Sequence, residues 1–295
     1  MTIDQALDAF CTHQRAQGRS EKTVAIYAHD LREVFVRLAP VDLDTLTAPA
    51  LAFVLADPAL ITLPTGMPKA PTTINRGRAA TRAFFAWAHG AGLIADNPAI
   101  DIHLQRVPRT LPAFLTDTEV RRLLKALTGR TGLLAKRDRI LIETFLGTGI
   151  RLQELVSLDV ADIDLDAKHL HVRRAKGGQP QVKFLNTHLR GLLRTYLQWR
   201  KKQGTDHCAA LFRSQRGTRL SPRQVGYRFA HWLQEAGIEK AISPHGLRHT
   251  FATRLYSRTG DLLVVQRALG HRNIATTEIY THLVDGALEE ALERL

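Results

Sequence analysis

The chain has 295 residues, 44% of them apolar, which is enough for two domains that each bury a core. Lys and Arg number 41 against 28 Asp and Glu, so the formal net charge is +13. The first 108 residues contain ten basic and ten acidic side chains, and the excess of 31 over 18 lies wholly in residues 109–295. A basic surface can be merely solvated, but this concentration favours a polyanionic partner.

Several classes of protein are excluded by simple patterns. Cys11 and Cys208 are the only cysteines and lack neighbouring ligands at metal-binding spacing, so we expect neither a disulfide framework nor a zinc site. The N-terminus lacks the basic-then-apolar pattern of a signal peptide. The longest apolar stretch, residues 51–63, is broken by Asp57 and Pro58 and is too short to span a bilayer. We therefore expect a soluble, cytoplasmic protein with no membrane partner.

The first hundred residues are predicted to be helical, with helices over residues 3–17, 20–38, 49–56 and 72–89. Ser20 can cap the second helix. Three prolines and a glycine in residues 61–71 predict a long loop.

The fourth helix carries a polar face formed by Asn75, Arg78 and Arg82, which follow one another at three- and four-residue spacing. Such a face either tracks a phosphate backbone or is only solvated, and both interpretations stay open. These three residues are the candidate DNA-binding residues of the first part.

Residues 105–114 contain two prolines, two arginines and little periodicity, which is typical of a linker between domains. We therefore predict a helical domain over residues 1–104 and a second, basic domain over residues 115–295.

The second domain begins with Thr116 and Glu119 at the spacing of a capping box, which predicts a helix to about Leu127. A helix over residues 136–146 follows and ends at Gly147-Thr148-Gly149. Arg151 then starts another short helix, where it and main-chain amides could bind one anion. Glycine-rich turns before helices are common, so this pattern alone is weak evidence.

Alternation in residues 168–186 predicts two strands, 169–174 and 181–185, joined by a turn at Gly177-Gly178. Lys176 lies at the tip of this hairpin, where it is either a solvent-exposed turn residue or an arm that reaches a phosphate. Arg173 and Arg174 of the same hairpin are interpreted as DNA-binding residues.

Helices are expected over residues 188–202 and 221–236, and Ser243-Pro244 predicts the start of another. His245 and Arg248 share one face of its first turn, whereas Leu247, Phe251 and Leu255 take the core side. Because a helix N-terminus offers free N–H donors, this turn is suited to hold a phosphate.

A helix over residues 261–269 is expected to end at Gly270, which places His271 just past it. Thr276 or Thr277 then starts a short helix that carries Tyr280. A tyrosine in such a place is by itself most simply a core residue.

These residue types suit one reaction. A phosphodiester under attack becomes a phosphorane whose oxygens need several positive donors, and arginine offers two parallel hydrogen bonds with a permanent charge. Preorganised Arg, Lys and His side chains can supply that charge without a metal. Tyrosine can then store the broken bond as a phosphotyrosyl ester.

The order Arg151, Lys176, His245-x-x-Arg248, Leu269-Gly270-His271, Tyr280 resembles the tyrosine recombinase (phage integrase) family, and residues 243–253 and 269–282 are especially similar to its Xer-like bacterial branch. The resemblance spans nearly the whole chain. It implies a mainly α fold with a small β-hairpin, in which a helical core-binding domain and an α+β catalytic domain form a C-shaped clamp around duplex DNA.

The resemblance also implies roles for the site residues. Tyr280 would attack the scissile phosphate and form a 3′-phosphotyrosyl link, which releases a 5′-hydroxyl. Arg151 and Arg248 would hold the non-bridging oxygens, and His271 would donate to the same phosphate.

The two remaining roles concern protons. Lys176 would protonate the leaving 5′-oxygen, and His245 would assist proton transfer at the tyrosine. Because bond energy is conserved, the resemblance implies no cofactor, neither ATP nor a metal.

Two features depart from the family pattern. The hairpin lacks the usual Gly-Lys-Gly-x-Lys pattern, so Lys176 is assigned by position alone. The loop at 61–71 is longer than a compact Xer-like domain needs.

The implied partners are double-stranded DNA with a specific recombination site and further copies of the chain in a synaptic tetramer. The C-terminal residues 286–295 are predicted to form an amphipathic helix that either folds back on its own domain or docks on a neighbouring protomer, and the resemblance favours docking. The sequence leaves open the DNA target, a second recombinase or accessory factor, and the choice between dimer resolution, integration or excision, and inversion.

The leading hypothesis is thus a site-specific recombinase. A relaxing type IB topoisomerase shares the chemistry but needs no defined site or tetramer. A non-catalytic DNA-binding protein on the same scaffold is disfavoured because every catalytic position is filled. A metal-dependent nuclease is disfavoured because no acidic cluster accompanies the basic residues.

Overall fold

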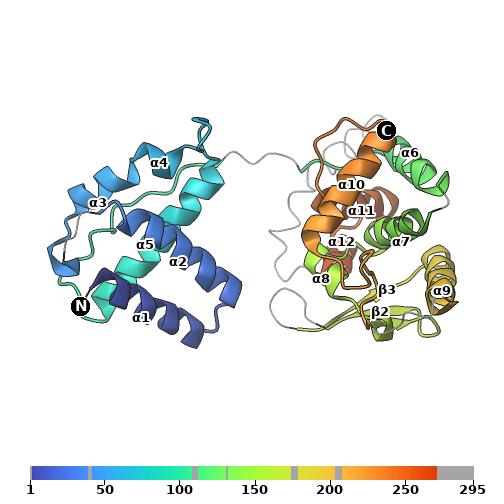
Figure 1. The fold of residues 1–295 in the computed structure, drawn as a ribbon, viewed down its shortest axis with the longest axis horizontal. Helices are drawn as coiled ribbons and strands as arrows, with labels where there is room; N and C mark the ends of the chain where they lie inside the picture. The colour runs from blue at the N-terminus through green and yellow to red at the C-terminus, as the bar shows by residue number, and fades with distance from the viewer. Residues whose placement is uncertain are drawn as a thin grey trace, which may run out of the picture. The chain divides into compact units, whose positions relative to one another are not determined.

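The chain divides into two compact units, Met1–Arg109 and Thr110–Leu295 (Figure 1). A computed structural model describes residues 2–38, 42–107, 112–130, 132–173, 179–202 and 208–270. Both units are mainly helical, and within these ranges the single sheet lies in the second unit. The predicted fold class, mainly α with a small β-sheet, is therefore confirmed.

The first unit consists of packed helices: α1 (Ile3–Ala16), α2 (Glu21–Phe35), α3 (Ala48–Leu55), α4 (Pro58–Ile61) and α5 (Pro71–Gly90), with a 3₁₀ turn at Leu43–Thr45. Ser20 caps α2 as predicted, because its hydroxyl accepts a hydrogen bond from the Thr23 N–H. Helix α5 contacts both α1 and α2. Phe10 of α1 and Phe35 of α2 each pack edge-on against Phe84 of α5, which builds the core.

The loop predicted over residues 61–71 is confirmed, since α4 ends at Ile61 and α5 begins at Pro71. Helix α4 was not predicted, and it forms because Asp57 accepts from the Ala59 N–H while Pro58 takes the first helical position. The Leu63 N–H then donates to the Met67 carbonyl at 2.7 Å and closes a tight turn. A helix of this length is too short to show a periodic apolar pattern in the sequence.

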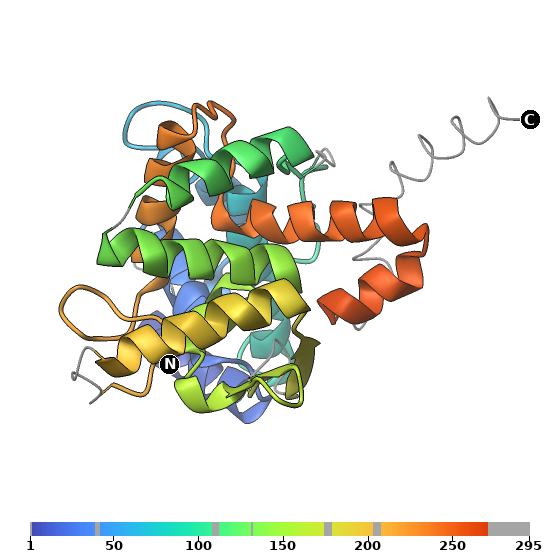
Figure 2. The ribbon, with the colours of Figure 1, turned by 90° about the vertical axis from the view of Figure 1, so that its right-hand side faces the viewer.

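The second unit is built around α7 (Leu133–Thr148). Helices α6 (Asp117–Thr128), α9 (Thr187–Lys202), α10 (Pro222–Glu235) and α11 (Pro244–Thr259) all contact it (Figures 1 and 2). Two short helices complete the described part of this unit, α8 (Leu152–Ser157) and α12 (Leu262–Leu269), together with a 3₁₀ turn at Val160–Asp162. The predicted capping box of Thr116 and Glu119 at the start of α6 is confirmed.

The sheet has three antiparallel strands in the order β1-β2-β3. Strands β2 (His169–Val172) and β3 (Gln181–Phe184) confirm the predicted hairpin. The two-residue strand β1 (Ile163–Asp164) was not predicted. The turn that carries Lys176 lies outside the described residues.

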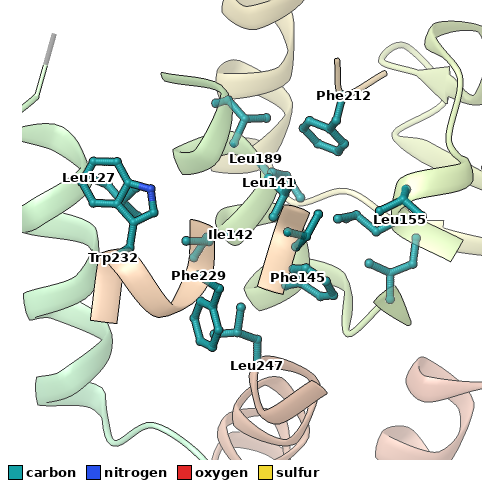
Figure 3. Packing of buried hydrophobic residues seen from close by; sticks show 14 of the residues in the cluster. Leu127, Leu141, Ile142, Phe145, Leu155, Leu189, Phe212, Phe229, Trp232 and Leu247 are labelled. Atoms are coloured by element: carbon teal, nitrogen blue, oxygen red, sulfur yellow. The ribbon is translucent and has the colours of Figure 1, made fainter. Parts of the chain in front are cut away.

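The core of the second unit fills the space between its helices (Figure 3). Phe145 of α7, Leu155 of α8 and Leu247 of α11 have no exposed surface. Leu247 immediately precedes Arg248, so the burial of Leu247 fixes the first turn of α11. This confirms the core face predicted for that turn.

The ends of two helices require glycine. Gly149, which ends α7, has a left-handed φ of 58°, and a Cβ there would lie 2.3 Å from the Phe251 ring. Gly270 ends α12 as predicted, with φ 68°.

The predicted cap of α11 was wrong in one respect. Ser243 occupies the N-cap position, but its side chain makes no capping hydrogen bond, and Pro244 takes the first helical position.

Candidate active site

Arg151 occupies the N-cap position of α8 directly after the turn at Gly149. Its main-chain N–H donates to Glu154 Oε2 at 3.0 Å, and its Nη1 donates to Glu154 Oε1 at 2.8 Å. Burial alone would raise the pKa of Glu154, but the hydrogen bonds and charge of Arg151 outweigh it and lower that pKa. An ionised Glu154 therefore holds the Arg151 guanidinium in place.

Arg248 reaches the same place from the first turn of α11. Its side chain is buried, with 2% of the residue exposed. Nη1 donates to the Gly149 carbonyl at 2.5 Å and Nη2 donates to the Leu269 carbonyl at 2.9 Å. Its charge also helps to lower the pKa of Glu154. The two predicted arginines, far apart in the sequence, are thus linked through the turn at Gly149, and the charges of both lower the pKa of Glu154.

His245 and His249 lie one helical turn apart on α11, with ring centroids 5.1 Å apart at 84°. Burial, with the charges of Arg248 and Arg151, lowers the pKa of His245. Burial, with His245 and Arg248, lowers the pKa of His249 to about 4. Both rings are therefore neutral at neutral pH, and a neutral His245 is able to accept a proton. His249 lies within residues 243–253, which resemble the family, but it was not predicted as a site residue.

Glu154 was not named from the sequence, and neither was a second charged residue, Lys183. Lys183 on β3 is 4% exposed and donates from Nζ to the Ala268 carbonyl at 2.5 Å. Burial, together with the charges of Arg248 and Arg151 and against the opposing charge of Glu154, lowers the pKa of Lys183 to about 8. Strict alternation along β3 was the available signal, since it places Lys183 on the inward face opposite to Val182 and Phe184.

Several predicted site residues lie outside the described residues: Lys176, His271, Tyr280, Arg174 and the C-terminal segment 286–295. Their predicted roles stay predictions.

The polar face of α5 is largely engaged within its own unit. Asn75 exchanges two hydrogen bonds with the main chain of Gln105, at 2.8 and 2.7 Å, and Arg78 donates to the His103 carbonyl at 2.9 Å. Arg82 is exposed. Asn75 and Arg78 thus fasten the end of the first unit to α5, whereas Arg82 is open to a ligand.

Arg173 is also engaged. It forms ion pairs with Asp159 at 2.6 Å and with Asp162 at 2.9 Å. These acidic residues bind the base of the hairpin to the segment after α8, so Arg173 has a structural role in the described part of the chain.

No group of three or more His, Cys, Asp and Glu side chains in the described ranges is arranged to hold a metal ion. None of the helices found there is long and apolar enough to cross a membrane.

Comparison with known proteins identifies the family of the chain. A family model described as the phage integrase family matches residues 113–286, and one described as the phage integrase N-terminal SAM-like domain matches residues 7–92. The tyrosine recombinase XerC of Mycobacterium tuberculosis (strain ATCC 25177 / H37Ra) is 38% identical over 297 residues, which cover 98% of this chain and 97% of the relative.

Two solved structures are also similar. The XerH site-specific recombinase bound to its difH substrate, in a pre-cleavage complex, is 25% identical with a TM-score of 0.70, covering 97% of this chain and 82% of that one. A lambda integrase tetramer bound to a Holliday junction shares the fold at 20% identity and a TM-score of 0.70, covering 92% of this chain and 78% of that one.

Together the two family models match residues 7–92 and 113–286, most of the chain, and so define its class. The chain belongs to the phage integrase family and is a tyrosine-type site-specific DNA recombinase.

Proposed function

We propose that the site cuts and rejoins DNA strands through a covalent bond to Tyr280, with neither a metal nor ATP. The observation that carries this proposal is the hydrogen bond from Arg248 to the Gly149 carbonyl, in the turn directly before Arg151, which brings the two arginines to one place in the fold. Two arginine side chains held together offer several cationic donors to the non-bridging oxygens of a phosphate.

In the first step, the Tyr280 oxygen forms a bond to the scissile phosphorus and the bond from phosphorus to the 5′-oxygen breaks. The Tyr280 proton passes to His245, whose neutral ring is suited to accept it. Lys176 gives a proton to the leaving 5′-oxygen. Arg151, Arg248 and His271 stabilise the charge on the non-bridging oxygens. Attack by a 5′-hydroxyl on the phosphotyrosyl bond reverses these steps and reseals the strand.

The partner in this proposal is duplex DNA that contains a specific recombination site, in the cytoplasm. The helical residues 1–104 would bind it together with the catalytic residues 115–295. The exposed Arg82 is the best placed of the α5 candidates to contact a phosphate, while Asn75 and Arg78 would act through the segment that they hold.

Recombination joins two sites, so the proposal includes a synaptic tetramer, with the C-terminal residues 286–295 exchanged between protomers. A cavity of about 440 Å³ between α7, α9 and α11 is a suitable acceptor, because Leu146, Leu189, Phe251 and Leu255 line it. An amphipathic helix could bury its apolar face there.

Nicked duplexes that trap the cleaved state test the proposal directly. Sites are first enriched from host DNA by binding, and wild-type and Tyr280→Phe proteins are then compared in EDTA. A denaturation-resistant adduct with the wild type alone supports metal-free covalent cleavage. No adduct on tightly bound sites favours the non-catalytic DNA-binding alternative, and adduct formation by Tyr280→Phe contradicts the mechanism.

Strand exchange separates the recombinase from a type IB relaxing enzyme. Recombination should require two copies of the defined site and form joint products, whereas a relaxing enzyme would remove supercoils from plasmids of any sequence.

A further inference from the structure

The C-terminal end of α12 is held by three side chains from outside the helix. Lys183 donates to the Ala268 carbonyl, Arg248 to the Leu269 carbonyl at 2.9 Å, and Gln181 Nε2 to the Gly270 carbonyl at 3.4 Å. The last carbonyls of a helix lack partners within the helix and form the negative end of its dipole. Cationic donors at this end are therefore favourable and fix its position.

This helix end matters because His271 is the next residue of the chain. Gly270 has a left-handed φ of 68°, and a Cβ on it would lie 2.3 Å from Gln181. Side chains of β3 thus determine where the chain leaves α12 towards His271. The same strand follows the hairpin turn that contains Lys176, so β3 connects two of the proposed catalytic segments.

Lys183 also contributes charge. Arg248 on α11 and Arg151 and Glu154 on α8 are the charged groups that act on it, while its partner across β2 is the apolar Leu170. A lysine ammonium has three donors, and among the described residues only the Ala268 carbonyl accepts one of them. The neighbouring β3 residues point away, since Val182 and Phe184 are 47% and 76% exposed.

We propose that Lys183 is a positioning residue of the cleavage site: it holds the end of α12 against β3 and adds a titratable positive charge beside Arg151 and Arg248. This inference rests on the proposed function, because it assigns Lys183 to the same site. It does not replace Lys176 as the proton donor.

A pH dependence follows. Lys183 is charged below a pH of about 8 and loses its charge above it, since its pKa is lowered to about 8. Arginine at this position would stay charged throughout. The ratio of wild-type to Lys183→Arg cleavage rates should therefore fall between about pH 7 and pH 9. Lys176 and Tyr280 are present in both proteins, so their titration cancels in this ratio.

The test uses full-length wild type, Lys183→Met, Lys183→Arg and the surface control Lys125→Met, which lies exposed on α6. Single-turnover adduct formation is measured on nicked duplexes at saturating protein. Lys183→Met should slow it about 10- to 100-fold with little change in DNA affinity, because a small misplacement of catalytic groups costs that much. Lys183→Arg should restore most of the rate at pH 7, and Lys125→Met should match the wild type.

Hydrogen exchange without DNA tests the positioning role independently. Amides of α12 from Val265 to Gly270 should exchange faster in Lys183→Met than in the wild type, with α6 unchanged. Unchanged exchange, a Lys183→Met rate equal to the wild type, or a ratio that stays constant with pH would each overturn the inference.

The two proposals fail in different ways. If the wild type itself forms no Tyr280 adduct, the proposed function fails, and the exchange experiment still decides whether Lys183 anchors α12. If Lys183→Met does not fold, the pH ratio of Lys183→Arg to wild type decides.

Discussion

The buried guanidinium of Arg248 donates a hydrogen bond to the main-chain carbonyl of Gly149, two residues before Arg151 in the sequence. This bond joins the start of α11 to the end of α7, so the turn that leads into Arg151 also positions the Arg248 guanidinium. The Arg248 bond to Leu269 extends the connection to α12. Substitutions that disturb this turn should therefore affect chemistry more than DNA binding.

Arg248→Lys should lower the cleavage rate by about 10²- to 10³-fold, comparable to the loss of one transition-state donor. Lysine keeps the charge but cannot reach the Gly149 and Leu269 carbonyls as a planar fork does. Adduct formation and DNA binding are measured on the same duplex. An equal loss in both would contradict a role specific to the reaction.

Glu154→Gln should destabilise the protein by about 1–3 kcal/mol at pH 7, because it leaves the Arg151 pairing without a negative charge. The pKa of Glu154 is lowered from 4.5 in the folded state, so its stabilising effect is present above that value and is lost as the pH falls through the folded pKa. Urea unfolding at pH 7 and below pH 4 should show the difference between the two proteins shrinking in acid. A difference independent of pH would argue against the ion pair.

Gly149→Ala should destabilise the protein by about 1–3 kcal/mol, because φ is left-handed and the new Cβ would collide with Phe251. Gly191→Ala is a matched control, since it lies within α9, with nothing within 4 Å of its Cβ position. Alanine there should stabilise by about 0.5–1 kcal/mol. Thermal unfolding measures both, and similar effects at the two sites would contradict the close approach at Gly149.

In the first unit, Arg82→Ala should weaken DNA binding at all sequences and reduce the slope of log affinity against log salt by about one. The stability of the Arg82→Ala protein should equal that of the wild type, because the Arg82 side chain is exposed. Asn75→Ala should instead lower stability, by about 1 kcal/mol, through its two lost bonds to Gln105. Binding isotherms at several salt concentrations, with thermal unfolding alongside, separate these outcomes. An unchanged salt slope in Arg82→Ala would indicate that the polar face of α5 is only solvated.

Local signals in the sequence were sufficient for most helices and for their ends. Thr116 and Glu119 predicted a capping box, and Gly270 predicted the end of α12, because both depend on residues a few positions away. The chemistry of phosphate binding likewise predicted that Arg151 and Arg248 belong together.

Partners across the fold could not be read from the sequence. Alternation of apolar and polar residues predicts which side chains of β3 face inward. Only the packed structure shows that Lys183 donates a hydrogen bond to the Ala268 carbonyl. Asn75 and Arg78 looked like an open basic face, but their acceptors lie some 25 to 30 residues away on the main chain of Gln105 and His103. Arg173 was predicted to contact DNA, which stays a prediction, and its ion pairs with Asp159 and Asp162 could not be read from the sequence.

The central claim is that Tyr280 forms a covalent bond to the 3′ side of the cut. Mass spectrometry of the trapped adduct after protease and nuclease digestion tests it most directly. The expected result is a peptide that carries a nucleotide 3′-phosphate on Tyr280, with a 5′-hydroxyl on the released strand. A nucleotide on any other residue, or a 5′-linked phosphate, would contradict it.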